Sequence, residues 1–184
     1  MAKLMVADDD RVVLFTLAEG LREAGFEVIE ARDGLRALAL CQSERPDLAL
    51  LDIRMPGLDG LELARRLRGE TTVPFLFFTA HDDEDLVQQA VKLGALGYLV
   101  KPLDVPRIVP MLRAALARSR EFDSLRAALH SNRDIGTAVG IAMRGWNLDQ
   151  QTAFERLRKH ARDRSARLVD IAREIVETGA CPET

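Results

Sequence analysis

Cysteines are few and long apolar runs are absent in this sequence of 184 residues, and both features narrow the class of protein. The two cysteines, Cys41 and Cys181, are too few for a disulfide framework or a thiolate cluster, which favours a reducing compartment. No stretch approaches the roughly 20 apolar residues that a membrane-spanning helix needs. The apolar residues 4–7 are too short a run for a secretion signal. We therefore expect a cytoplasmic protein with no membrane partner.

The C-terminal part of the chain also lacks the residue groups that an enzyme needs. His160 has no cysteine and no pair of acids beside it in the sequence. The usual nucleophile–base and acid–base arrangements therefore have no candidate residues there. We do not expect an enzymatic output.

The two parts of the chain differ in charge. Residues 1–117 carry 14 basic and 19 acidic side chains, whereas residues 118–184 carry 12 basic and 10 acidic ones. A basic cluster in the second part spans twelve positions with a single acid, Asp163, among them. It contains Arg156, Arg158, Lys159, Arg162, Arg164 and Arg167. Such a cluster is either a solvated helix face or a surface for a phosphate backbone.

Short apolar runs alternate five times with amphipathic patterns in the first part of the chain. The apolar runs cover residues 4–7, 26–31, 48–51, 74–78 and 98–100. Between and after them, apolar residues recur at helical spacing. This alternation predicts an α/β fold, in which a doubly wound, parallel, five-stranded sheet is covered by helices.

Polar side chains follow four of these predicted strands. Asp8 and Asp9 follow the first, Asp52 the third and Lys101 the fifth, while Thr79 ends the fourth. Ligands of open parallel sheets bind outside the carboxyl ends of the strands, so we expect these side chains to converge. Carboxylates that lie close together repel one another, and an all-oxygen site suits Mg²⁺ completed by a phosphate. The lysine and the threonine can hold further phosphoryl oxygens.

These residues, together with the loop sequence Met-Pro-Gly-Leu-Asp-Gly at 55–60, resemble the receiver domain of two-component response regulators, which has a flavodoxin-like fold. The resemblance covers about residues 1–117. It implies a sensor histidine kinase as partner, slow hydrolysis of the phosphoryl group and no other enzymatic activity. It assigns Asp52 as the phosphoacceptor, and Asp8, Asp9, Asp52 and the backbone carbonyl of Arg54 as Mg²⁺ ligands. It also assigns Thr79, Lys101 and Tyr98 as the residues that sense the phosphate and switch.

A continuous helix over about residues 106–133 is predicted to join residues 1–117 to residues 118–184 without a linker. Its apolar residues recur at steps of three, four or seven: Ile108, Leu112, Ala115, Phe122, Leu125 and Leu129. Two interpretations remain open. The helix packs on its own domain, or it forms a short parallel coiled coil in a homodimer, at least when the protein is phosphorylated.

The remaining chain is predicted to form a small all-α domain of three helices. Asn147, with Gln150 three positions later, is expected to cap the second helix, and Ser165 is expected to cap the third. Gly136 and Gly140 interrupt the first helical pattern and permit another molecule to approach closely. A domain of this size buries little surface by itself, which favours support from the long helix or from a dimer.

The order of small and apolar residues over positions 121–178 resembles the ANTAR family of transcription antitermination regulators. The resemblance is carried by Asp-Ile-Gly-Thr-Ala-Val-Gly-Ile-Ala-Met-Arg at 134–144, Ala-Phe-Glu-Arg-Leu-Arg at 153–158, and Leu-Val-Asp-Ile-Ala at 168–172. It implies binding to paired hairpins in nascent mRNA, so that a terminator cannot form. The chain departs from the family at Val139 and Ala142, where a lysine and a leucine are common. The candidate RNA-binding residues are Ala138, Gly140, Arg144, Arg158, Arg162 and Arg164.

Two other outputs remain possible from the sequence. A receiver followed by basic helices is also found in DNA-binding regulators, but the tail has no helix-turn-helix spacing with a polar recognition helix. The helices could instead bind another protein. Steep salt dependence of binding to a two-hairpin RNA, but not to duplex DNA, would distinguish an RNA-binding output from a DNA-binding one. Absence of nucleic-acid binding in either phosphorylation state would favour the protein-binding output.

Overall fold

The computed structural model of the protein describes residues 1–80, 83–102 and 104–181, and the chain divides into two compact units, Met1–Ser119 and Arg120–Thr184. The first unit contains the strands β1 (Lys3–Ala7), β2 (Glu27–Ala31), β3 (Leu48–Leu51), β4 (Phe75–Thr79) and β5 (Tyr98–Val100). Its helices are α1 (Arg11–Glu23), α2 (Gly34–Glu44), α3 (Gly60–Glu70) and α4 (Glu84–Lys92). Helix α5 (Val105–Trp146) contributes to both units, and α6 (Gln150–Asp163) and α7 (Leu168–Thr178) belong to the second.

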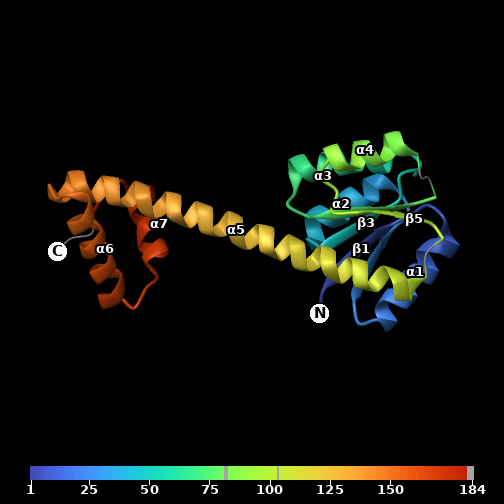
Figure 1. Ribbon diagram of the computed structural model, residues 1–184, viewed down its shortest axis with the longest axis horizontal. Helices are drawn as coiled ribbons and strands as arrows, with labels where there is room; N and C mark the ends of the chain where they lie inside the picture. The colour runs from blue at the N-terminus through green and yellow to red at the C-terminus, as the bar shows by residue number, and fades with distance from the viewer. Residues whose placement is uncertain (81–82, 103, 182–184) are drawn as a thin grey trace. The chain divides into compact units, whose positions relative to one another are not determined.

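The sheet of the first unit is parallel throughout, with the strand order β2-β1-β3-β4-β5. Successive side chains of a strand point to opposite faces, so each strand supplies two hydrophobic cores. Leu50 packs with α1 and the start of α5, whereas Leu51 packs with α2, α3 and α4. Figure 1 shows these helices on the two faces of the sheet. The predicted doubly wound, five-stranded α/β fold is confirmed.

Aspartates begin four helices of the first unit. The side chains of Asp10, Asp33, Asp59 and Asp83 each accept hydrogen bonds from backbone N–H groups in the first turns of α1, α2, α3 and α4. These N–H groups have no partner inside the helix, so each cap stabilises the start of its helix.

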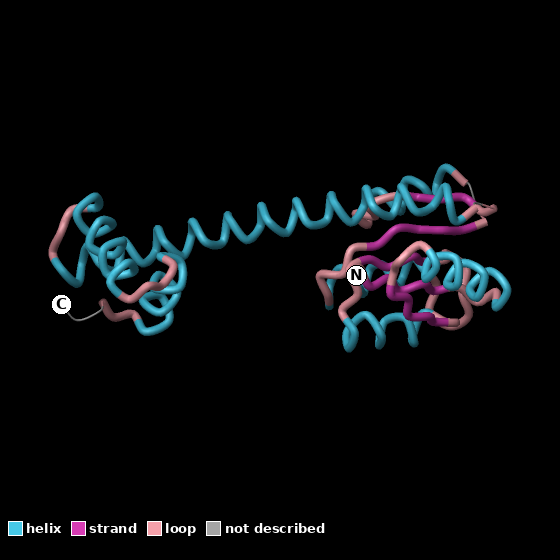
Figure 2. Tube along the Cα trace, turned by 90° about the horizontal axis from the view of Figure 1, so that it is seen from below, coloured by secondary structure: helices cyan, strands magenta, loops and turns pink. Residues whose placement is uncertain are grey.

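The second unit is built of helices, whose trace is drawn in Figure 2. The end of α5 packs against α6 and α7 through Ala138, Ala142, Ala153, Leu157, Ala161, Ile171, Ala172 and Ile175, all of which are buried. The small alanine side chains permit close packing of these helices. The prediction of helices in this part of the chain is confirmed. No helix of the described residues is both long and apolar enough to cross a membrane.

Both predicted caps in the second unit are wrong. Asp149, not Asn147, caps α6 by accepting a hydrogen bond from the N–H of Thr152 at 3.1 Å. The residue before α7 is Arg167, and its side chain makes no capping hydrogen bond. Asn147 and Ser165 instead lie in the connecting turns, where both have a φ of 52°. Asparagine tolerates this left-handed backbone through its short polar side chain.

The apolar residues of α5 divide into two groups. Ile108, Leu112 and Ala115 are buried in the core of the first unit. Leu125 and Leu129 are 56% and 70% exposed. The first half of the predicted apolar repeat therefore packs on its own domain, which is the first of the two interpretations of this helix.

Candidate functional site

The carboxyl edge of the sheet collects the polar residues predicted at the strand ends. Asp8 and Asp52 each follow a strand by one residue, Thr79 ends β4, and Lys101 follows β5. Backbone hydrogen bonds extend the sheet into this edge. The N–H of Asp52 donates to the Ala7 carbonyl at 2.8 Å, and the N–H of Lys101 donates to the Thr79 carbonyl at 2.8 Å. The rigid sheet thus positions side chains that are far apart in the sequence.

Three carboxylates meet at this edge. Asp8 is 1% exposed, Asp52 is 7% exposed and Asp9 is exposed to solvent, and oxygens of all three lie within 4.8 Å of one another. The Asp52 Oδ1 atom is buried and accepts no hydrogen bond from the residues that the structure describes. A buried oxygen without a donor calls for a cation or a reacting group. Because the ligand set contains only oxygen, the residues present fit a magnesium ion.

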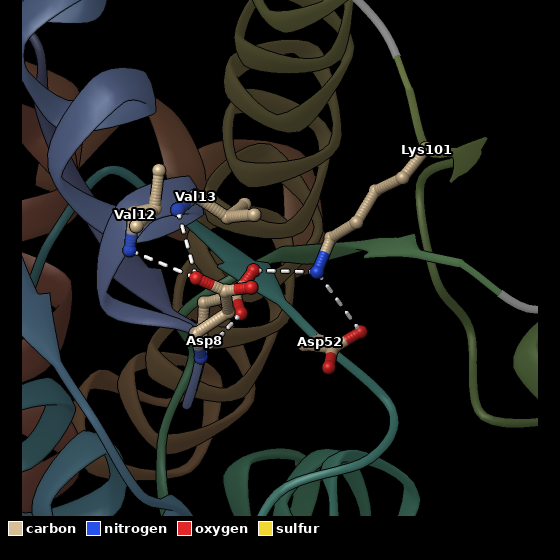
Figure 3. Close-up of polar contacts among 6 residues, drawn as sticks. Asp8, Val12, Val13, Asp52 and Lys101 are labelled. Carbon is tan, nitrogen blue, oxygen red and sulfur yellow. Dashed lines mark hydrogen bonds and ion pairs between the residues drawn. The ribbon is translucent and has the colours of Figure 1, made fainter.

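Lys101 supplies the positive charge of the site, as Figure 3 shows. Its Nζ donates to Asp8 Oδ2 at 2.6 Å and lies 3.5 Å from Asp52 Oδ1. The same ammonium lies 5.4 Å from the centre of the Phe78 ring, within the range of a cation–π contact. The sequence had not pointed to Phe78, because an aromatic residue in a buried strand looks like an ordinary core residue.

Burial controls the protonation of Asp8. It raises the pKa of this carboxyl above its ordinary value, and the hydrogen bond and charge of Lys101 act in the opposite direction. The other oxygen of Asp8 accepts a hydrogen bond from the N–H of Asp10 at 3.0 Å. Lys101, which follows β5, and the Asp10 N–H, just before α1, favour the ionised carboxylate, but burial outweighs them and the pKa stays above its ordinary value.

The remaining predicted receiver residues lie at this edge or on the strand that leads to it. Thr79 is fully buried. Tyr98 is half-buried, and its ring centre lies 6.2 Å from that of Phe77. Arg54 lies in the loop after β3 with its side chain exposed. In the pairing of β4 with β5, Tyr98 lies opposite Phe77, and Phe77 is two positions before Thr79 in β4.

Gly60 supports the phosphoacceptor candidate in a way that sequence reasoning missed. Its N–H donates to the Ile53 carbonyl at 2.8 Å. A Cβ atom at this position would overlap the carbonyl oxygen of Asp52. Glycine therefore allows the start of α3 to pack directly on the Asp52 backbone. The loop motif at 55–60 contains Gly60, but only the three-dimensional contact explains why it is glycine.

The candidate RNA-binding residues of the second unit have different environments. Arg144, Arg158 and Arg162 are exposed and form no ion pair with any residue in the described ranges. Arg164 is exposed, but its Nη1 lies 2.9 Å from Glu174 Oε2. Gly140 is half-buried.

Ala138 requires a correction. Its exposed fraction is 0%, and it packs among the side chains of the helical core. A side chain in that position cannot touch RNA. The sequence predicts Ala138 as a small residue on a binding face, whereas in the structure its small side chain lies where α6 and α7 pack against α5.

Comparisons with known proteins agree on the two parts of the chain. Residues 4–113 match the family described as response regulator receiver domain, and residues 123–176 match the ANTAR domain. The transcriptional regulatory protein PdtaR of Mycobacterium tuberculosis is 30% identical over 98% of this chain and 92% of its own length. Sporulation initiation phosphotransferase F of Bacillus subtilis is 35% identical over 58% of this chain and 86% of its own length.

A crystal structure of a response regulator receiver domain protein from Clostridium thermocellum superposes with a TM-score of 0.63. It is 27% identical and covers 66% of this chain and 99% of its own chain. A receiver followed by an ANTAR output points to a regulatory protein rather than an enzyme. The chain belongs to the two-component response regulators and carries an ANTAR domain behind its receiver domain.

Proposed function

We propose that this response regulator binds hairpins in nascent mRNA when its receiver is phosphorylated, and so prevents transcription termination. The observation that carries the proposal is the buried Asp52 Oδ1, which accepts no hydrogen bond within the described part of the chain and lies beside Lys101 and two further carboxylates. This arrangement suits acceptance of a phosphoryl group. The ANTAR domain provides the output.

In the proposed reaction, Asp52 attacks the phosphorus of a phosphohistidine on a sensor histidine kinase. The P–N bond breaks and a P–O bond to the carboxylate forms. Lys101 and Thr79 bind oxygens of the transferred group. Asp8, Asp9, Asp52 and the carbonyl of Arg54 would hold Mg²⁺, which neutralises charge on the phosphoryl oxygens. Water then slowly attacks the phosphorus in the same site, the P–O bond to Asp52 breaks, and release of inorganic phosphate restores the carboxylate and resets the receiver.

The proposed switch uses Thr79 and Tyr98. Thr79 moves toward the phosphoryl oxygens, and the Tyr98 ring turns into the space that Thr79 vacates. The half-buried position of Tyr98 beside Phe77 supports this step, because the ring already lies at the boundary between the core and solvent. The surface formed by α4, β5 and the start of α5 then changes shape.

We further propose a homodimer through a short parallel coiled coil of α5. Leu125 and Leu129 are four positions apart, so both lie on one side of the helix, and both are more than half exposed. Exposed leucines in this spacing are typical of a seam that a second helix covers. A dimer would also present two output domains to two adjacent hairpins.

The output is proposed to use Gly140, Arg144, Arg158, Arg162 and Arg164. Arg144, Arg158 and Arg162 are exposed without a carboxylate partner in the described ranges, so binding a phosphate does not require an existing ion pair to break. Binding through such cations releases counterions, so we expect the affinity to fall steeply with salt.

The test is binding of the full-length protein to a transcribed leader RNA with two adjacent hairpins. Affinity is measured with and without beryllofluoride and Mg²⁺ as a phosphoryl mimic, beside an Asp52→Ala variant. We expect tighter binding with the mimic and no such gain in the variant. Equal binding in all samples would overturn the switch. No RNA binding by the protein, with or without the mimic, would overturn the RNA output in favour of a protein or DNA partner.

A further inference from the structure

A groove between α5 and α6 in the second unit is not used by the mechanism described so far. It is lined by Ile135 and Val139 of α5 and by Gln150, Gln151 and Phe154 of α6, and its volume is about 460 Å³. We call it the α5–α6 groove. Its lining combines apolar side chains, one aromatic ring and two amides, which is the usual composition of a small-ligand site.

Phe154 gives the α5–α6 groove an aromatic wall. It is 36% exposed, whereas its neighbours on the core side of α6, Ala153 and Leu157, are 0% and 1% exposed. The ring therefore does not complete the helical core. An exposed ring beside an apolar floor is a surface on which a flat group can stack.

Charge around the groove favours an anionic ligand. Gln151, Phe154, Arg158 and Arg162 follow one another at steps of three and four, so they form one stripe along α6. The two arginines of this stripe have no ion-pair partner among the residues that the structure describes.

The rest of the basic cluster is largely occupied. Arg156 lies over the Trp146 ring at 4.4 Å, and Arg164 and Arg167 pair with Glu174 and Asp170 at 2.9 and 2.8 Å. Within this basic cluster, the arginines that have no ion pair or ring contact with a described residue are thus the two that continue the groove stripe, Arg158 and Arg162. A flat apolar group attached to phosphates fits this combination.

Two glycines of α5 are the next residues in the sequence after the two α5 residues that line the groove. Gly136 follows Ile135 and Gly140 follows Val139, both in the interior of α5. A Cβ atom at either glycine would meet no heavy atom of the described chain within 4 Å, apart from the helix backbone itself. Glycine in a helix interior weakens the helix, and packing inside this protein gives no reason for it here.

We propose that the α5–α6 groove binds one unpaired base of an RNA loop, an inference that rests on the proposed RNA-binding function. The base stacks on the Phe154 ring over the Ile135 and Val139 side chains. Amides of Gln150 and Gln151 hydrogen-bond to its edge, as glutamine does with bases elsewhere. Arg158 and Arg162 bind the phosphates that flank it. Loop bases of RNA are unstacked and accessible, so they can enter such a groove.

The test compares wild-type protein with Phe154→Leu, which keeps an apolar side chain but removes the flat ring. Both are full-length and loaded with beryllofluoride and Mg²⁺. Their affinities are measured for the two-hairpin RNA and for versions in which each loop base in turn is removed. Val176→Ala on α7, which alters a 38% exposed side chain outside the groove lining, is the control. Trp146 fluorescence during thermal unfolding checks that the helical unit of each variant folds.

We expect Phe154→Leu to weaken RNA binding roughly 5- to 150-fold, the range for loss of stacking on one base. One abasic loop position should weaken binding to the wild type by a similar factor and add little in Phe154→Leu. Equal affinity of the two proteins, or the same abasic penalties in both, would overturn the base site while the RNA function stands. No RNA binding by the loaded wild type would instead overturn the RNA function itself.

Discussion

The Lys101 ammonium donates to the buried Asp8 carboxylate at 2.6 Å, although the two residues are 93 positions apart in the chain. The side chains are 15% and 2% exposed. Each of these buried charges compensates the other, because either one alone would be desolvated without a partner of opposite charge. Lys101 therefore has two functions in this site: it lies within reach of Asp52 and it compensates Asp8.

Replacing Lys101 by methionine should destabilise the receiver unit by about 3 kcal/mol at pH 7, since the Asp8 charge is then buried without its partner. Burial raises the pKa of Asp8, so the folded state favours the protonated form. The loss should therefore diminish as the pH falls through this raised pKa. Urea unfolding followed by circular dichroism at several pH values measures the effect. The double variant Lys101→Met with Asp8→Asn should recover stability at pH 7. A loss that stays constant as the pH is lowered from neutral toward the ordinary range of a carboxyl group would contradict this account.

Gly60→Ala should destabilise the receiver unit by about 2 kcal/mol and slow phosphorylation, because the new methyl group displaces the Asp52 backbone. Gly69→Ala on the same helix is the matched control. A Cβ atom there would meet nothing within 4 Å in the described residues, so it should stabilise the helix by about 0.5–1 kcal/mol. Phosphorylation by a small-molecule phosphodonor, followed by mass spectrometry, gives the rate. Equal rates in the two variants would show that the contact with Asp52 is unimportant.

Arg158→Gln and Arg162→Gln should each weaken RNA binding and lower the slope of log affinity against log salt by about 0.7–0.9. Arg164→Gln should lower it less, because Arg164 already pairs with Glu174 at 2.9 Å. Fluorescence anisotropy over a salt series measures the slope. If Arg164→Gln lowers the slope as much as Arg158→Gln does, its ion pair does not limit RNA contact.

The buried thiol of Cys41 should make the free energy of unfolding fall at alkaline pH. It is fully buried in the receiver core, and burial raises the pKa of its thiol to about 12. The unfolded thiol ionises near pH 8.5, so above that pH the unfolded state gains stability from ionisation and the folded state does not. The difference in unfolding free energy between wild type and Cys41→Ala should therefore shrink by about 1.4 kcal/mol per pH unit above about pH 8.5. An unchanged difference at pH 9.5 would show that the thiol ionises in the folded protein.

Local pattern was sufficient to predict the order of the elements and the residues of the carboxyl edge. Apolar runs such as residues 48–51 form strands buried on both faces, and a parallel arrangement brings all strand ends to one edge. Asp8, Asp52 and Lys101 could therefore be grouped from their positions after strands. The family resemblance of both domains also follows from sequence, and the comparisons confirm it.

Tertiary structure alone decided which groups are free and which are occupied. Ala138 is buried because α6 and α7 pack on it, and Arg164 pairs with a residue ten positions away. Asn147 and Ser165 are residue types suited to helix capping, but in the structure they lie in turns with a left-handed backbone conformation instead. Gly60 and Phe154 likewise gain their meaning from neighbours that are distant in sequence. Sequence sets the residue types and their spacing, whereas burial and pairing depend on packing between segments, which no local pattern encodes.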